Sequence, residues 1–321
     1  MRDGIDVEFR EVGMRDGLQN TKGFFPTEAK IAWMKAEVAT GMPAIEICSF
    51  VPPKLIPQFK DAVEVVEATQ ATDTGECVIS ALIPNMRGAE RGVELGMKKL
   101  NFVASVSVTH NLQNVRRKPE ESIEDFRRIV EMRDALPDDK KFFIDGGLST
   151  VFGCTLEGSV DPAATVKLAQ HFVEAGADHL TVCDTVGYAN PKQVRDLFRL
   201  LQSELGPHIT MTAHFHDTRG LGLANMEAAL DVGIRSFDAC LAGLGGCPWA
   251  PGATGNMVME DGVFMAEAMG LRTGVDLDKL CAIREIIETN LPDERLSGAI
   301  AKAGLPKDYT PATAQFAAAA E

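Results

Sequence analysis

The chain has 321 residues, 45% of them hydrophobic, and a formal net charge of −14. This length can bury one large core or two ordinary ones, and the acidic balance argues against a nucleic-acid-binding protein. No apolar run reaches the roughly 18 residues that a membrane span needs, and the polar first residues predict no secretory or transit segment. Seven scattered cysteines, an odd number, indicate reduced thiols and a cytoplasmic location.

Short apolar runs alternate with amphipathic segments along the chain. We expect strands at residues 7–12, 44–48, 77–83, 99–103, 142–147, 179–183, 209–213 and 236–240. Apolar positions spaced by three and four residues predict helices at residues 27–40, 61–70, 88–96, 123–136, 162–177, 191–205 and 222–233. Eight strands that alternate with helices predict a (β/α)8 TIM barrel. An open doubly wound sheet is the alternative, but no GxGxxG motif follows the first strand.

The last part of the chain is expected to differ from the barrel. Residues 276–290 predict one more helix packed on it, so we assign residues 1–290 to a barrel catalytic domain. Residues 291–321 are then a C-terminal extension that packs on the barrel or is partly disordered, and the alanine-rich residues 317–320 are expected to fray.

The most informative motif is a pair of histidines, His214 and His216, at the end of the seventh expected strand. Residues i and i+2 of a strand point to the same face, so the two imidazoles are aimed at one point. Such a pair can hold a metal ion. Two ordinary histidines at a strand end are an equally good interpretation of the pair alone.

Other polar residues follow the strands that neighbour the seventh. Asp16 follows the first strand and Asn256 follows the eighth, and a closed barrel brings strands 7, 8 and 1 together. With His214 and His216 they offer two nitrogens, a carboxylate and an amide oxygen. This set suits octahedral Mg²⁺ or Mn²⁺ better than a closed zinc site. Taken singly, Asp16 reads as a loop-capping carboxylate and Asn256 as an ordinary turn residue; Asp217 is expected to cap or to support a ligand.

Two further residues carry chemistry that a metal site can use. Arg15, beside Asp16, can stabilise an oxyanion or enolate, although a solvated surface arginine is the default interpretation. Cys247 lies in a glycine-containing loop that can carry a thiol over a ligand, and a thiol without a role is the alternative. The other cysteines have weaker claims, with Cys154 and Cys183 near strand ends and Cys48, Cys77, Cys240 and Cys281 assigned to packing.

Six motifs in order resemble those of the hydroxymethylglutaryl-CoA lyase family, within the superfamily of metal-dependent lyase and synthase barrels. They are EVGMRDGLQN at 11–20, IE at 45–46 with FVPPK at 50–54 and PQ at 57–58, DTVG at 184–187, HFHDT at 214–218, AGLGGCP at 242–248, and GN at 255–256 with ED at 260–261. The likeness covers residues 7–290.

The resemblance implies a role for each matching residue. Asp16, His214, His216 and Asn256 would ligate Mg²⁺ or Mn²⁺. The implied catalytic residues are Arg15, which would steady a thioester enolate, Cys247, which would move protons, and Asp184 and Glu46, which would act near the substrate hydroxyl or hold the metal ligands. The implied substrate and CoA contacts are Arg15, Gln19, Lys22 and Thr185.

The resemblance also implies the reaction, a metal-assisted retro-Claisen cleavage of 3-hydroxy-3-methylglutaryl-CoA or a related branched 3-hydroxyacyl-CoA. The products would be acetyl-CoA and acetoacetate, or the corresponding keto acid. Such an enzyme would bind an acyl-CoA, neither nucleic acid nor membrane, and form a homodimer or larger homo-oligomer. The alternatives are a Claisen-type acyl-CoA/2-oxo acid synthase of the same superfamily and a non-catalytic ligand-binding barrel.

Three departures from the family pattern stand out. Met14 replaces a common proline, with little expected effect. Gly146 and Gly147 stand where the family often has an aromatic residue, which predicts more room in the acyl pocket. The C-terminal residues carry no cysteine and no peroxisomal signal, so an intersubunit thiol switch is not expected.

Overall fold

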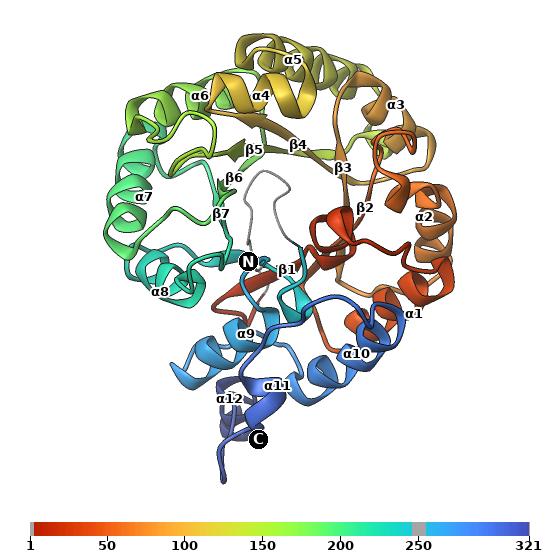
Figure 1. Cartoon of the computed structure of the whole chain (residues 1–321), viewed down its shortest axis with the longest axis vertical. Helices are drawn as coiled ribbons and strands as arrows, with labels where there is room; N and C mark the ends of the chain where they lie inside the picture. Colours follow the sequence, from red (N-terminus) through yellow and green to blue (C-terminus); the bar gives the residue numbers. More distant parts are fainter. Residues whose placement is uncertain (1–2, 246–254, 321) are drawn as a thin grey trace.

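The protein is described by a computed structural model that covers residues 3–245 and 255–320, with side chains described up to residue 316. In these ranges eight parallel strands close into a barrel in the order β1 to β8, inside a ring of helices (Figure 1). The strands are Glu8–Glu11 (β1), Ala44–Ser49 (β2), Val78–Ile83 (β3), Lys99–Ser105 (β4), Phe143–Ser149 (β5), His179–Asp184 (β6), Met211–Phe215 (β7) and Ser236–Ala239 (β8). Because β1 pairs with β8, the predicted TIM barrel is confirmed and the open sheet is excluded.

The helices surround the barrel and cover its outer face. They are Thr27–Ala39 (α1), Ala62–Gln70 (α2), Met86–Glu94 (α3), Val108–Val115 (α4), Pro119–Ala135 (α5), Pro162–Glu174 (α6), Pro191–Leu205 (α7), Gly222–Asp231 (α8), Met259–Ala268 (α9), Leu277–Asn290 (α10), Ile300–Ala303 (α11) and Ala312–Ala320 (α12). The amphipathic pattern missed α4, where Val108 and Leu112 are exposed. A local signal was present, because Ser107 caps the helix by accepting a hydrogen bond from the His110 amide at 3.1 Å.

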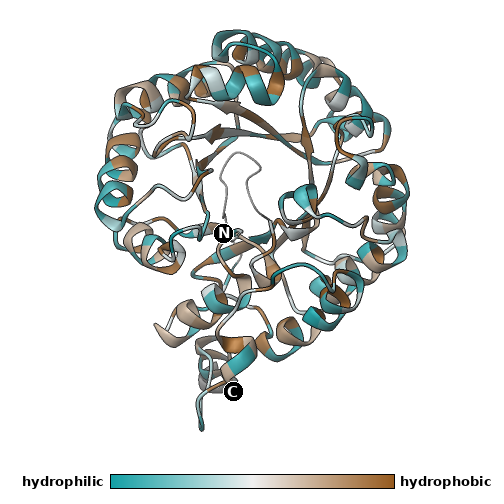
Figure 2. Cartoon of the chain, in the orientation of Figure 1, coloured by the Kyte–Doolittle hydropathy of each residue, from teal (hydrophilic) through white to brown (hydrophobic). Residues whose placement is uncertain are grey.

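The hydrophobic core lies between the barrel and the helix ring, where the outer faces of the strands meet the helices. Phe102 of β4 packs edge-to-face against Phe126 of α5 and Phe172 of α6. Figure 2 shows hydrophobic residues along the strands and both kinds of residue on the helices, as amphipathic helices on a barrel require. The inner faces of the strands are free to carry polar side chains, and they do so around Arg10.

The segment after the barrel packs against α9 and α10 rather than against the strands. Glu267 of α9 accepts a hydrogen bond from the Thr313 amide at 2.8 Å, and the Arg272 guanidinium lies over the Phe316 ring. Figure 1 shows α11 and α12 below α9, at the rim of the ring. The division of the chain at residue 290 stays a prediction. Among the described residues, no helix combines the length and the hydropathy that crossing a bilayer requires.

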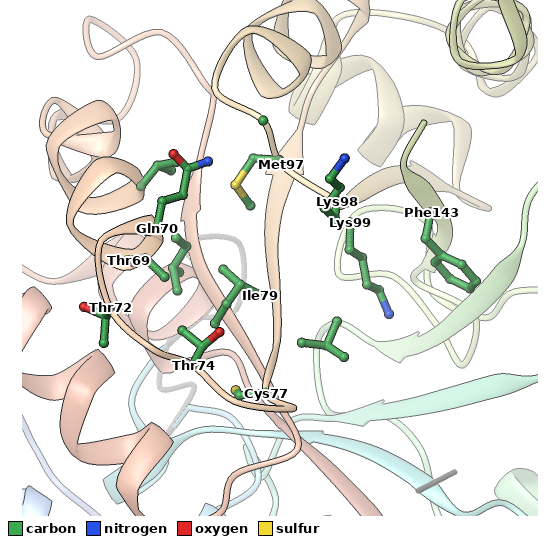
Figure 3. Close-up of a pocket in the computed structure, with 14 residues that line it drawn as sticks. Thr69, Gln70, Thr72, Thr74, Cys77, Ile79, Met97, Lys98, Lys99 and Phe143 are labelled. Atoms are coloured by element: carbon green, nitrogen blue, oxygen red, sulfur yellow. The ribbon is translucent and has the colours of Figure 1, made fainter. Parts of the chain in front are cut away.

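Among the described residues, two hollows larger than the cavity at the other end of the barrel lie near the amino-terminal ends of the strands. Figure 3 shows one of about 630 Å³ beside the starts of β3 and β4, lined by apolar groups such as Ile79 and Met97 and bordered by Lys99 and Phe143. In (β/α)8 barrels this end serves stability, whereas chemistry gathers at the carboxyl ends of the strands. The size of these hollows therefore does not identify the functional site.

Candidate metal centre

Four predicted ligands meet at the carboxyl end of the barrel. A π-helical turn over Gly13–Gly17 (η1) follows β1 and brings Asp16 over the barrel mouth. The Asp16 Oδ2 atom lies 3.6 Å from Nε2 of His216 and 3.8 Å from Nε2 of His214. The Asn256 amide nitrogen donates to the same oxygen at 2.8 Å. The expected convergence of these four side chains is therefore present in the fold.

The donor set fits a divalent cation. One ligand atom each from Asp16, His214 and His216 lies within 4.8 Å of the others. The Oδ1 atom of Asn256 is buried without a hydrogen-bond donor, and a cation would satisfy such an orphaned oxygen. Two imidazole nitrogens, a carboxylate and an amide oxygen leave coordination positions for substrate oxygens, as Mg²⁺ and Mn²⁺ sites require.

The local electrostatics hold Asp16 and His216 in the protonation states that bind metal. Burial raises the pKa of Asp16, but Arg15 and the two histidines outweigh it and lower the value to about 2. Burial and the neighbouring His214 lower the pKa of His216 to about 4. At neutral pH Asp16 is thus a carboxylate and His216 a neutral imidazole, which are the ligand forms.

His214 is oriented by an aspartate that sequence reasoning missed. Its Nδ1 atom lies 2.9 Å from Oδ2 of Asp238 on β8. Burial raises the pKa of Asp238, but Arg10 and His214 lower it far more, so the carboxylate is ionised and Nδ1–H donates. This leaves Nε2 of His214 free to face Asp16. The signal in the sequence was a charged residue inside each of two buried strands, Arg10 in β1 and Asp238 in β8.

Arg15 lies at the side of the ligand cluster. Its guanidinium contacts the Asp16 carboxylate, and its Nε atom lies 3.2 Å from Oε2 of Glu46 on β2. Glu46 in turn accepts a hydrogen bond from the Asn101 amide at 2.5 Å. A cavity of about 90 Å³ opens beside these groups; its lining includes Leu82, Val103, Gly147, Ser149, Cys183 and Thr185. Asp16, His214 and His216 line the same cavity, so the arrangement places a cationic side chain beside the ligand cluster in one small pocket.

Not every predicted site residue faces this pocket. Thr185 does, and its hydroxyl accepts the Thr150 amide at 2.8 Å. Asp184 does not line the cavity: its two oxygens accept the amides of Tyr188 at 2.8 Å and Ala189 at 3.1 Å, and burial raises its pKa to about 6. Its side chain caps the loop between β6 and α7, and the expectation that Asp184 acts near the substrate hydroxyl or holds the metal ligands stays a prediction.

Of the predicted substrate and CoA contacts, Arg15 and Thr185 line the cavity, whereas Gln19 and Lys22 do not. Gln19 is half-buried and Lys22 is exposed, with the Lys22 backbone amide donating to Glu294 at 2.8 Å. Neither lines the pocket beside Arg15. Cys247 lies outside the described residues, so its predicted role stays a prediction. Asp217 accepts the Gly222 amide at 2.7 Å at the start of α8, which confirms the capping interpretation.

The interpretation of the two glycines after the fifth strand needs correction in one half. A Cβ atom at Gly146 would lie 2.8 Å from the Phe172 ring of α6, so this residue faces the helix layer and opens no acyl pocket. Gly147, its neighbour, does line the cavity. Cys183 also lines it, and burial raises the pKa of its side chain, so it remains a thiol.

Comparisons with known proteins agree with this site. A family model described as HMGL-like matches residues 6–287. Hydroxymethylglutaryl-CoA lyase YngG of Bacillus subtilis (strain 168) is 40% identical over 285 residues, which cover 89% of this chain and 93% of the relative. (R)-citramalyl-CoA lyase of Chloroflexus aurantiacus is 35% identical over 308 residues, 93% of this chain and 95% of the relative.

A solved structure extends the likeness to the fold. It is an HMG-CoA lyase from Acinetobacter baumannii in complex with coenzyme A and 3-methylmalate, with a TM-score of 0.88 and 40% identity, covering 97% of this chain and 99% of the other. The family resemblance seen in the sequence motifs is thus confirmed. The chain belongs to the HMGL-like family, the family of the hydroxymethylglutaryl-CoA lyases.

Proposed function

We propose that this protein is a divalent-metal-dependent carbon–carbon lyase that cleaves 3-hydroxy-3-methylglutaryl-CoA or a closely related branched 3-hydroxyacyl-CoA. The convergence of Asp16, His214, His216 and Asn256 beside Arg15 carries the proposal. The relatives named as lyases support it, as does a solved relative that holds coenzyme A. The homo-oligomer and the cytoplasmic location expected from the sequence stay predictions.

The site residues divide the work of a retro-Claisen cleavage. Asp16, His214, His216 and Asn256 would hold Mg²⁺ or Mn²⁺, which when bound polarises substrate oxygens and lowers the pKa of the hydroxyl. As the hydroxyl proton leaves to a base, the C2–C3 bond breaks, C3 becomes a ketone and C2 becomes part of the acetyl-CoA enolate.

Arg15 would stabilise that enolate oxygen. Its side chain is partly buried and ion-paired with Asp16 and Glu46, so little reorganisation is needed when charge develops on the thioester oxygen. Cys247 would return a proton to C2 and complete acetyl-CoA. Glu46 would serve this step by keeping its carboxylate against the Arg15 side chain, 3.2 Å from Nε.

A second substrate is favoured by one observation. A relative that aligns with 93% of this chain is an (R)-citramalyl-CoA lyase. Its substrate carries the hydroxyl and a carboxylate on one carbon, so cleavage gives pyruvate in place of acetoacetate. The two activities therefore differ in their keto-acid product and can be separated in one assay.

The deciding experiment supplies purified protein and Mg²⁺ with each thioester in turn. We expect acetyl-CoA with acetoacetate, or with pyruvate for the citramalyl thioester, and loss of turnover on chelation. Cys247→Ala should lose most turnover and keep its metal. Absence of cleavage of either thioester, together with condensation of acetyl-CoA and a 2-oxo acid, would favour the synthase. Absence of both reactions in a metal-loaded protein would favour a ligand-binding barrel.

A further inference from the structure

We propose that Arg10 is a positioning residue that holds both halves of the site, the metal-ligating His214 and the enolate-stabilising Arg15. This inference rests on the proposed function. Arg10 lies in the barrel interior below the ligand cluster, and its side chain is only 7% exposed. Two separate paths lead from its guanidinium to the site, one made of hydrogen bonds and the other of hydrogen bonds that end in an ion pair.

The first path leads to the metal side. Arg10 donates two hydrogen bonds to the Asp238 carboxylate, from Nε to Oδ1 at 2.7 Å and from Nη2 to Oδ2 at 2.8 Å. The same Oδ2 atom accepts a hydrogen bond from His214 Nδ1 at 2.9 Å. The bidentate pair fixes the plane of the carboxylate, and the carboxylate fixes the rotation of the imidazole.

The second path leads to the Arg15 side. The Nη1 atom of Arg10 donates to the Asn101 amide oxygen at 3.3 Å, which settles the direction in which the amide nitrogen points. That nitrogen donates to Oε1 of Glu46 at 2.5 Å, and Oε2 of Glu46 lies 3.2 Å from Nε of Arg15. Arg10 therefore reaches Arg15 through one amide and one carboxylate.

Arg10 is itself anchored by the remaining wall of the barrel. Nη1 also donates to Asp145 on β5 at 3.0 Å, and Nη2 donates to the Thr181 hydroxyl on β6 at 3.1 Å. Thr181 in turn donates to Asp145 at 3.1 Å. The planar guanidinium thus donates to five acceptor atoms on four residues, a geometry that a lysine ammonium cannot keep.

The test compares one variant for each path with two variants of Arg10. Asp238→Asn interrupts the first path, and Asn101→Leu interrupts the second. Arg10→Lys keeps the positive charge but loses the planar guanidinium, and Arg10→Met removes both the charge and the guanidinium. Mn²⁺ affinity of the metal-free protein is measured by calorimetry, which needs no thioester. Steady-state kcat and KM are measured at saturating metal, and melting temperature monitors folding.

We expect Asp238→Asn to weaken Mn²⁺ binding by about tenfold to hundredfold. Asn101→Leu should leave Mn²⁺ affinity unchanged and lower kcat, with KM little affected. Arg10→Lys should show both effects in one folded protein, and adding Asp238→Asn to it should weaken Mn²⁺ binding by less than the sum of the single effects.

Two results would overturn the proposal. One is Arg10→Lys that binds Mn²⁺ and turns over substrate as the parent does. The other is any Arg10 variant whose losses follow melting temperature alone, with no separation between the Asp238 and Asn101 paths. If no thioester is cleaved by the parent protein, the Mn²⁺ measurements still judge the metal path, and only the proposed function fails.

Discussion

The Asn256 amide nitrogen donates a 2.8 Å hydrogen bond to the Asp16 carboxylate across 240 positions of sequence. The contact joins the turn after β1 to the segment after β8, where the barrel closes. The Asn256 backbone also pairs with that of His216, so three of the proposed ligands are tied together by the fold. The ligand cluster is thus preorganised by barrel closure.

Removing the Asn256 amide should weaken the metal site without unfolding it. Asn256→Ala deletes the orphaned Oδ1 atom and the bond that orients Asp16. We expect Mn²⁺ affinity to fall by about tenfold to hundredfold, as for other groups that ligate or orient at metal centres. Calorimetry on metal-free protein measures this. Asn225→Ala, which removes a buried amide on α8, is the control, and an equal loss there would contradict a ligand role for Asn256.

Gly147 should set how large a branch the acyl pocket accepts. A Cβ atom at this position would lie 3.1 Å from the Phe102 carbonyl oxygen, a tight but possible contact, and would project from the cavity wall. Because β5 lies opposite β1 in the barrel, this wall faces the turn with Arg15 and Asp16 across the mouth. Gly147→Ala should therefore lower kcat/KM more for thioesters with an ethyl or larger branch than for the methyl substrate. An equal loss of kcat/KM for all of these thioesters would show that Gly147 does not determine which branch size is accepted.

A buried pair of glutamates should make stability depend on pH. The Oε2 atom of Glu37 is buried without a donor and its side chain meets that of Glu11, an arrangement that one shared proton satisfies. Burial raises the pKa of both carboxyls above the ordinary 4.5, so the folded chain holds a proton that the unfolded chain releases. The stabilisation is then complete below 4.5 and is lost as the pH rises through the folded-state value.

Glu37→Gln tests that sign, since glutamine offers Glu11 a donor that does not titrate. Urea unfolding at several pH values between acid and mildly alkaline should show the parent losing stability relative to the variant as the pH rises. Parallel stability profiles for the two proteins would exclude the shared proton. Glu11 also accepts the amides of Gly13 at 2.5 Å and Leu241 at 2.9 Å, so turnover would follow the same trend.

A buried lysine should hold the loop after β2 against α1. The Lys30 ammonium donates to Asp61 at 2.6 Å and to the Gln58 carbonyl oxygen at 2.6 Å, and its side chain is 2% exposed. Lys30→Met leaves the Asp61 carboxylate buried without its cation, which should cost about 3–5 kcal/mol in the free energy of unfolding. Adding Asp61→Asn should recover part of the loss. A loss no larger than that of a surface substitution would contradict the assignment.

The barrel and the histidine pair could be predicted because both are local patterns. Strand alternation and the spacing of helical apolar positions act over a few residues, and His214 and His216 share a face in any strand. Arg15 and Asp16 are adjacent in the turn after β1, so their proximity was also predictable from the sequence. The predicted helix at 123–136 and the observed α5 differ mainly at the start, where Pro119 occupies the first helical position.

The sequence by itself determined the eight alternating units and the residue types that chemistry needs, because these depend on short-range periodicity. Only the tertiary structure decided which face of each strand turns inward. Gly146 faces the Phe172 ring on α6, whereas its neighbour Gly147 lines the cavity. Asp184 accepts hydrogen bonds from backbone amides of the loop that follows it and does not line the cavity. Arg10 contacts Asp238, which is 228 positions away in sequence, for the same reason. The pairing of strands around the closed barrel, and not proximity in the chain, determines which interior side chains are neighbours.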